Sequence, residues 1–164
     1  MSNWIPAYVG LGSNLDDPER QVALAFAALE RLPESRLVLR SGLYRSAPVG
    51  PVEQPDFINA VAGMLTRLPA RELLAALKDL EAQLGRARPV VRWGPRRIDL
   101  DLLVYGNERH HEPELEVPHP GIASRAFVLM PLAEIAPALQ VPGRGRVAKL
   151  LQDAGSTEVE RIAA

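Results

Sequence analysis

The sequence predicts an α+β fold of the ferredoxin-like kind, in which helices pack on an antiparallel sheet. Two observations lead to this prediction. Segments with strand and helix character follow one another in the order β-α-β-β-α-β, and extra helical turns come after them. The chain has 164 residues, of which 47% are hydrophobic and 24% charged. These values suit one folded domain with a real core, so we expect residues 1–164 to form a single domain.

The first strand and helix are expected in the N-terminal part of the chain. Residues 7–12 (AYVGLG) have strand character. In the helix that follows, Asp17 can serve as the N-cap and Pro18 suits the first helical position, while Pro33 would end the helix. An apolar stripe at helical spacing supports this helix: Val22, Phe26 and Leu29.

The next two strands are expected at residues 36–44 and 57–68, with a long loop between them. The loop, residues 46–56 (SAPVGPVEQPD), contains three prolines and a glycine. It is too long for a tight hairpin, and loops of this length in small domains often have a function.

The second half of the chain continues the pattern. Residues 71–84 are expected to form a helix, because Leu73, Leu77, Leu80 and Leu84 share one face and Gly85 follows. A fourth strand is expected at residues 97–105. Helices are expected at 125–135 and 147–154, followed by a frayed tail at 155–164.

Composition excludes several classes of function. The absence of cysteine rules out disulfides, zinc–thiolate sites and thiol nucleophiles. The formal net charge of −1 does not favour a protein whose main partner is a nucleic acid. No apolar run approaches the roughly 20 residues that span a bilayer, and residues 1–6 do not resemble a secretory signal. A cytoplasmic location is therefore expected.

The most informative feature is the pair Asp99 and Asp101 in the fourth expected strand. Residues two apart in a strand face the same side, with Cα atoms roughly 6.5–7 Å apart. Two neighbouring carboxylates repel unless a cation joins them, and Mg²⁺ prefers such ligands together with phosphate oxygens. The opposite face would pack in the core through Ile98, Leu100, Leu102 and Val104. A solvated polar strand face remains the alternative.

An arginine-rich segment lies directly before this pair. Residues 86–97 read RARPVVRWGPRR. Arginine offers bidentate contacts to phosphate oxygens, so this loop could bind a phosphorylated ligand. Two alternatives remain open, an ordinary arginine-rich surface loop and a nucleic-acid patch in which Trp93 stacks on bases. The adjoining carboxylates would repel a polyanion but suit a metal-bound triphosphate.

Two shorter motifs carry weaker indications. Residues 10–14 (GLGSN) match neither a phosphate-binding P-loop nor a dinucleotide fingerprint, and a strand-ending turn is the simplest interpretation. His119, between two prolines, could contact phosphate or protonate a leaving group, although a lone loop histidine is more often only exposed. His110 and His111 are expected in a turn, without a role.

Several stretches together resemble one family. The run RWGPRRIDLD at residues 92–101 is similar to the signature of the 6-hydroxymethyl-7,8-dihydropterin pyrophosphokinases. Other stretches resemble the family in order and spacing: GLGSNL (10–15), YRSAPVGPVEQPDFINAV (44–61), LEAQLGRAR (80–88) and VPHPGIASRAFVLMPLAEIAP (117–137). The resemblance covers nearly the whole chain, and the ordered set is far more specific than any one motif.

The resemblance implies an ATP- and Mg²⁺-dependent enzyme of folate biosynthesis that moves pyrophosphate from ATP to the pterin hydroxymethyl group and releases AMP. It implies that two Mg²⁺ ions bind Asp99 and Asp101, and that Arg86 and Arg96 are the catalytic arginines. The implied ATP-binding residues are Glu81, Arg86, Arg88, Arg92, Trp93, Ile98, His119 and Arg125. The implied pterin-binding residues are Ser46, Val49, Phe57, Asn59, Trp93 and Phe127.

The partners expected from this resemblance are the two small-molecule substrates, with no nucleic acid and no membrane, and the protein is expected to be a monomer. The loops at 46–56 and 86–96 would close over ATP and exclude water. Departures from the family pattern at Ala47, Phe57, Glu114, Glu116 and Pro120 bear on substrate affinity. The alternatives are a ferredoxin-like nucleic-acid-binding module that uses the Arg/Trp loop, and a metal-dependent phosphohydrolase.

Overall fold

The computed structural model describes residues 3–48, 50–85, 96–155 and 158–162. In these ranges the helices are α1 (Pro18–Glu30), α2 (Ala70–Gly85), α3 (Ala126–Ile135) and α4 (Val147–Ala154). The main sheet runs in the order β10 (Val159–Arg161), β3 (Tyr44–Ser46), β4 (Phe57–Thr66), β1 (Ile5–Ser13) and β5 (Asp99–Tyr105), and β2 (Ser35–Arg40) also pairs with β4. Two small ribbons join β6 (His110–Glu112) to β7 (Leu115–Val117) and β8 (Gln140–Val141) to β9 (Gly145–Arg146).

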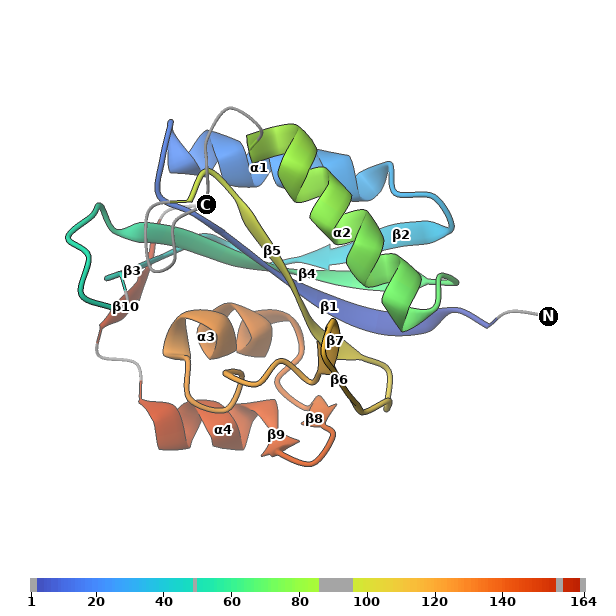
Figure 1. The fold of residues 1–164 in the computed structure, drawn as a ribbon. Helices are drawn as coiled ribbons and strands as arrows, with labels where there is room; N and C mark the ends of the chain where they lie inside the picture. The colour runs from blue at the N-terminus through green and yellow to red at the C-terminus, as the bar shows by residue number, and fades with distance from the viewer. Residues whose placement is uncertain (1–2, 49, 86–95, 156–157, 163–164) are drawn as a thin grey trace.

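Every strand pair in the described part of the chain is antiparallel, and helices lie on both faces of the main sheet. Figure 1 shows α1 and α2 on one face and α3 and α4 on the other. The expected mixed fold with an antiparallel sheet is therefore confirmed. None of the helices in the described ranges has the length and apolar composition needed to cross a membrane.

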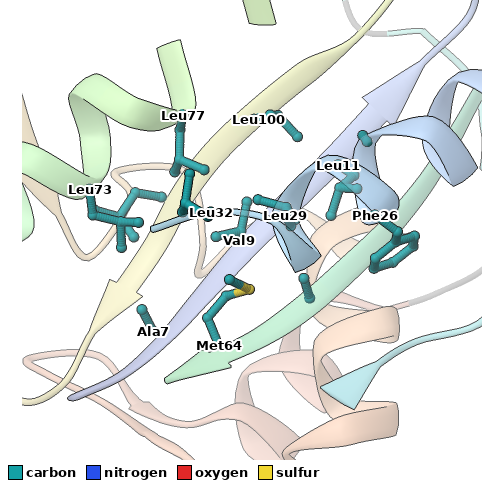
Figure 2. Close-up of a cluster of buried hydrophobic side chains, with 14 of the residues drawn as sticks. Ala7, Val9, Leu11, Phe26, Leu29, Leu32, Met64, Leu73, Leu77 and Leu100 are labelled. Carbon is teal, nitrogen blue, oxygen red and sulfur yellow. The ribbon is translucent and has the colours of Figure 1, made fainter. Parts of the chain in front are cut away.

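The larger core lies between the sheet and the pair α1 and α2. Figure 2 shows Phe26 and Leu29 of α1 and Leu77 of α2 among the side chains gathered on this face of the sheet. Leu29 and Leu77 are fully buried, as the apolar stripes of both helices predict. Burying each such side chain stabilises the fold by about 1.5–3 kcal/mol, so this face fixes the sheet against its helices.

A smaller core lies under α3 and α4 and contains Leu103 and Val104 of β5 side by side. The pairing of β1 with β5 shifts register between Tyr8 and Val9, which marks a bulge. A bulge inserts one residue and reverses the alternation beyond it. The prediction that Val104 shares a face with Leu100 is therefore wrong, while Asp99 and Asp101, which precede the bulge, keep the expected alternation.

The strand expected at residues 36–44 is divided into β2 and β3, which pair with different parts of β4. The break comes at Ser41, whose hydroxyl accepts a 2.9 Å hydrogen bond from the N–H of Val61. Next to it, the N–H of Gly42 donates to Glu134 of α3 instead of to a strand. Side-chain acceptors thus interrupt the ladder here, although the backbone N–H of Ser41 still donates to the carbonyl of Val61 at 3.0 Å.

Three further local expectations are wrong. Asp17 occupies the expected N-cap position of α1, but it has a φ of 64° and, in the described part of the chain, its side chain does not make the expected capping hydrogen bond. His110 and His111 lie in β6 and not in a turn. The tail is not frayed throughout, because residues 159–161 form β10 and pair with β3. An N–H bond from Ile162 to the carbonyl of Leu43, 2.9 Å long, extends this pairing.

Candidate active site

The two aspartates of β5 lie opposite two glycines of β1. Asp99 pairs with Gly12, and Asp101 pairs with Gly10. Residues directly opposite each other in an antiparallel pair share a face of the sheet. All four line one cavity, so the alternation predicted from the sequence is confirmed.

This first cavity has a volume of about 240 Å³ and extends from β5 across β1 to β4 and α3. A Cβ atom at Gly12 would lie 3.5 Å from Oδ1 of Asn59 and would fill the floor between that amide and the carboxylates. Other lining residues are Ser46, Ala47, Gln54, Phe57, Arg96, Arg125, Phe127 and Val128. The cavity therefore joins aromatic and amide groups at one end to carboxylates and arginines at the other.

The surroundings of Asp99 strongly disfavour the charged form of its carboxylate. Burial, the nearby charge of Asp101 and that of Glu81 raise its pKa to about 7. Arg96 offsets part of this effect, since its Nε lies 3.5 Å from Oδ1 of Asp99. The Asp99 side chain is still 38% exposed, which leaves it accessible to a ligand. Such a site favours a bound cation.

Glu81 of α2 lies behind the aspartate pair. Its Oε2 accepts a 2.7 Å hydrogen bond from the backbone N–H of Leu100, and its Oε1 lies 3.4 Å from Nζ of Lys78. Burial raises the pKa of Glu81, against the effect of these partners. Glu81 is absent from the described lining of both cavities at the site, and its contacts are with β5 and its own helix.

A second cavity, of about 250 Å³, lies on the other side of Asp101. Asp101 lines both cavities. The second cavity is bordered by Lys78 of α2, by the β6–β7 ribbon and by His119. The two cavities therefore share one carboxylate in their linings.

His119 is held in a defined orientation beside the second cavity. The backbone N–H of His119 donates to the carbonyl of Leu103 at 2.9 Å, and its ring Nδ1 accepts a hydrogen bond from the backbone N–H of Gly121 at 3.0 Å. Burial lowers the pKa of His119, although the charge of Asp101 opposes this. The neutral imidazole is therefore favoured near neutral pH, as a hydrogen-bonding group more than as a cation.

The residues expected to bind the pterin lie together where the structure describes them. Ser46, Phe57, Asn59 and Phe127 all line the first cavity. Nδ2 of Asn59 donates to Oγ of Ser46 at 2.8 Å and to the carbonyl of Tyr44 at 3.3 Å. These bonds fix the orientation of the amide at the cavity floor.

The residues expected to bind ATP are more dispersed. His119 lines the second cavity, but Arg125 lines the first, with its guanidinium 5.8 Å from the ring centroid of Phe127. Ile98 is 5% exposed and packs in the larger core. The pterin candidate Val49 lies outside the described residues, as do the remaining ATP candidates: Arg86, Arg88, Arg92 and Trp93.

Reasoning from the sequence missed three polar residues that line the cavities, Gln54 in the first and Lys78 and Glu112 in the second. Lys78 carried a usable indication, since it is one of only two lysines in an arginine-rich chain and precedes Glu81 by three positions. Gln54 had none, because it is one polar residue in a loop of irregular structure.

Comparisons with known proteins identify the family of this chain. Residues 8–137 match the family model described as 7,8-dihydro-6-hydroxymethylpterin-pyrophosphokinase (HPPK). A 2-amino-4-hydroxy-6-hydroxymethyldihydropteridine pyrophosphokinase of Pseudomonas aeruginosa is 47% identical over 155 residues, which cover 94% of this chain and 95% of the relative. The enzyme of the same name from Haemophilus influenzae is 43% identical, over 90% of this chain and 92% of that one.

Solved structures show the same fold. A crystal structure of Plasmodium falciparum HPPK-DHPS with pterin and p-hydroxybenzoate matches with a TM-score of 0.76 at 14% identity, over 100% of this chain and 48% of that one. The wild-type Plasmodium protein matches with a TM-score of 0.73 at 12% identity, over 99% of this chain and 45% of that one. This chain thus spans about half the length of those proteins. On the family match and the near full-length relatives, the chain belongs to the 7,8-dihydro-6-hydroxymethylpterin-pyrophosphokinase family.

Proposed function

We propose that this chain moves the pyrophosphoryl group of ATP to the hydroxymethyl oxygen of 6-hydroxymethyl-7,8-dihydropterin and releases AMP, with Mg²⁺ bound at Asp99 and Asp101. Pyrophosphoryl transfer to hydroxymethyldihydropterin, in folate biosynthesis, is the activity of the family to which the chain belongs. The observation that carries the proposal is that Asp101 lines both cavities, so that two substrates can meet at the aspartate pair.

The first cavity suits the pterin. A flat heteroaromatic ring can stack against the rings of Phe57 and Phe127, which line this cavity. Asn59 provides both a donor and an acceptor for the edge of the ring, and its bond to Ser46 holds it in place. The pterin hydroxymethyl group would then point toward the carboxylates at the other end.

The second cavity suits the nucleotide. Lys78 and His119 at its border can donate to phosphate oxygens, and Asp101 marks the end from which the triphosphate would enter the first cavity. Glu114 and Glu116 also line it. They disfavour a further negative group at that wall, so we propose that the adenosine part and not the triphosphate lies beside them.

The aspartate pair fits Mg²⁺ on its chemistry. Within the described ranges no cluster of three or more His, Cys, Asp or Glu side chains is arranged to hold a metal ion. Mg²⁺ needs only one or two carboxylates when phosphate oxygens and water supply the rest. Such a cation would offset the burial and the neighbouring negative charges that raise the pKa of Asp99 to about 7. When bound, Mg²⁺ would neutralise and align the triphosphate, and we expect two ions.

The transfer itself would need alignment and charge stabilisation and no strong protein base. The hydroxymethyl oxygen forms a bond to the β-phosphorus, the bond from that phosphorus to the α-phosphate oxygen breaks, and the hydroxyl proton passes to solvent. Arg96, held beside Asp99, would stabilise negative charge on the transferred group, and Arg125 would contact phosphate from the α3 side. We assign the same task to Arg86, with further phosphate contacts from Arg88 and Arg92.

We also infer that the fold is ferredoxin-like and that the protein acts as a monomer without a nucleic-acid partner. The strand order β3-β4-β1-β5, with α1 and α2 on one face, supports the ferredoxin-like assignment, while the division of β2 from β3 and the added β10 depart from it. The loops at 46–56 and 86–96 would close over ATP. Unchanged hydrogen exchange in both loops on adding a nonhydrolysable ATP analogue would contradict closure.

The test is mass spectrometry of the products formed from ATP, Mg²⁺ and 6-hydroxymethyl-7,8-dihydropterin. We expect AMP and the pterin pyrophosphate, both lost on adding EDTA or with Asp101→Ala. Inorganic phosphate without modified pterin would point to a phosphohydrolase. No AMP from folded protein supplied with Mg²⁺ would refute the proposal and leave only shared ancestry with the family.

A further inference from the structure

Asn14, at the end of the GLGSN motif, joins two segments that are distant in the sequence. It is 2% exposed and follows β1 directly. Its backbone N–H donates to the carbonyl of Arg96 at 2.9 Å, and its Oδ1 accepts the N–H of Arg96 at 2.8 Å. Asn14 therefore binds both backbone polar groups of the candidate catalytic arginine.

The other side of the same amide holds the loop between β3 and β4. Nδ2 of Asn14 donates to Oε1 of Gln54 and to the carbonyl of Pro55, both at 2.9 Å. Both hydrogens of the amide and its oxygen are thus engaged. Gln54 and Arg96 line the first cavity from opposite segments, and Asn14 bonds to both of them.

An adjacent contact strengthens this anchor. Oδ2 of Asp16 accepts from Nε of Arg97 at 3.0 Å and from Nη2 at 2.8 Å. Asp16 has a φ of 54° and is followed by Asp17 with a φ of 64°, a backbone conformation that non-glycine residues seldom adopt. The turn after β1 is thus shaped so that consecutive anchors hold residues 96 and 97.

We propose that Asn14 is a positioning residue for pyrophosphoryl transfer. It holds the Arg96 backbone and the Gln54–Pro55 segment in fixed positions relative to the aspartates of β5. The connection to these aspartates is short, because Gly12, two residues before Asn14, pairs with Asp99. An asparagine suits this place because it presents one acceptor and two donors at once. Aspartate lacks the donors, and an apolar side chain lacks both.

This inference rests on the proposed function and has its own mechanism. Arg96 lies 3.5 Å from Asp99 through its side chain, so a shift of its backbone would move the guanidinium relative to the transferred group. Misplacing a catalytic group by about 1 Å can cost on the order of a hundredfold in rate. Loss of the Asn14 amide should therefore act mainly through Arg96.

The experiment measures kcat and the KM for each substrate in Asn14→Ala, below the melting temperature of every variant. A matched control is Thr66→Val, which removes a fully buried polar group that bonds to Ser35, Glu34 and Leu68 at the far end of β4. We expect kcat to fall about a hundredfold in Asn14→Ala. The control should stay within about twofold of the wild type, because its site shares no partner with the cavity.

A double-mutant cycle separates positioning from general stability. If Asn14 acts through Arg96, adding Asn14→Ala to Arg96→Ala should lower kcat no further, because residues that act as a unit are not additive. A merely structural asparagine would lower the rate by the same factor in both backgrounds. The proposal would be overturned if the two losses of kcat multiply in the double variant, or if Asn14→Ala has a wild-type kcat.

Two further readouts cover the remaining outcomes. Asn14→Asp keeps the shape of the side chain and the acceptor for Arg96. We expect this variant to raise the pterin KM, with a smaller loss of kcat than in Asn14→Ala. Wild-type kinetics in Asn14→Asp would overturn the proposal even if Asn14→Ala fails to fold. Exchange of the Arg96 amide hydrogen should accelerate at least about tenfold in Asn14→Ala, which removes its acceptor, and not in Thr66→Val. Unchanged exchange refutes the anchor. An inactive wild type refutes only the proposed function.

Discussion

The Glu81 carboxylate accepts a 2.7 Å hydrogen bond from the backbone N–H of Leu100, the residue between Asp99 and Asp101. This bond brings a third negative charge from α2 to the aspartate pair, where it raises the pKa of Asp99 after burial and the charge of Asp101. Glu81 thus supports the strand through its hydrogen bond and raises the site's demand for a cation through its charge.

These two effects of Glu81 can be separated by substitution. Glu81→Gln keeps an oxygen for the Leu100 N–H and removes the charge, so the pKa of Asp99 should move from about 7 toward its ordinary value. Glu81→Ala should do the same and also destabilise the fold by about 1 kcal/mol, since the N–H loses its acceptor. Carboxyl NMR titration and urea unfolding measure the two effects. An unchanged Asp99 pKa in Glu81→Gln would contradict this account.

Neutralising the aspartates should abolish activity without harming the fold. We expect Asp99→Asn and Asp101→Asn each to lower kcat roughly a hundredfold or more, as the loss of a centre that stabilises charge does. Their melting temperatures should not fall, because the amide removes repulsion between carboxylates. Asp79→Asn makes the same charge change at an exposed position of α2 and should keep full activity. Equal kinetics in all three variants would exclude the metal site.

Mg²⁺ binding should weaken as the pH falls through about 7, because the proton on Asp99 then competes with the ion. Calorimetry of Mg²⁺ with a nonhydrolysable ATP analogue, in two buffers of different ionisation enthalpy, should show proton release near that pH. The stability of the metal-free protein has the opposite sense. The raised pKa contributes stability that is complete below the ordinary aspartate pKa and is lost as the pH rises through about 7.

Filling the cavity floor should weaken pterin binding. A Cβ at Gly12 makes only ordinary contact with Asn59, so Gly12→Ala should fold normally with a small rise in the pterin KM. Gly12→Val adds two methyl groups in the cavity and should raise that KM by about tenfold or more, while valine suits the strand. Steady-state kinetics check this order. A pterin KM unchanged by valine would move the pterin away from this cavity.

Glu134 should stabilise the fold in a pH-dependent way. Burial raises the pKa of Glu134, but hydrogen bonds from Tyr44, Gly42 and Arg161 lower it by more. The net effect is a lowered pKa. This contribution is present above the ordinary glutamate pKa and is lost as the pH falls through the lowered value. Urea unfolding should show Glu134→Gln less stable by about 1–3 kcal/mol at neutral pH, with the difference shrinking in acid.

The exposed control for this prediction is Glu160→Gln. Glu160 pairs with Arg45 on the surface at 2.7 Å, with a side chain 67% exposed. Such pairs contribute about 0–1 kcal/mol, so this substitution should have little effect at any pH. A Glu134→Gln variant that behaves like Glu160→Gln would mean that the Tyr44–Glu134 bond, 2.7 Å long, adds no net stability.

The local pattern of the sequence was enough for much of the fold. The leucines of α2 and the apolar stripe of α1 predicted both helices, because helix periodicity depends only on neighbours within a turn or two. Alternation along β5 likewise predicted that Asp99 and Asp101 share a face. It failed at Val104, where a bulge set by pairing with β1 reverses the alternation.

The motif at residues 92–101 and its companions identified the family and its activity from the sequence by itself, and strand and helix periodicity determined most of the elements. Only the tertiary structure decided that Asp101 borders two cavities, that Asn14 holds Arg96 beside Gln54, and that Glu134 ties β10 to β3 through Arg161 and Tyr44. The reason is physical. These relationships are hydrogen bonds and surfaces shared by segments far apart in the chain, and no local pattern encodes which distant partner a polar side chain will meet once the core has packed.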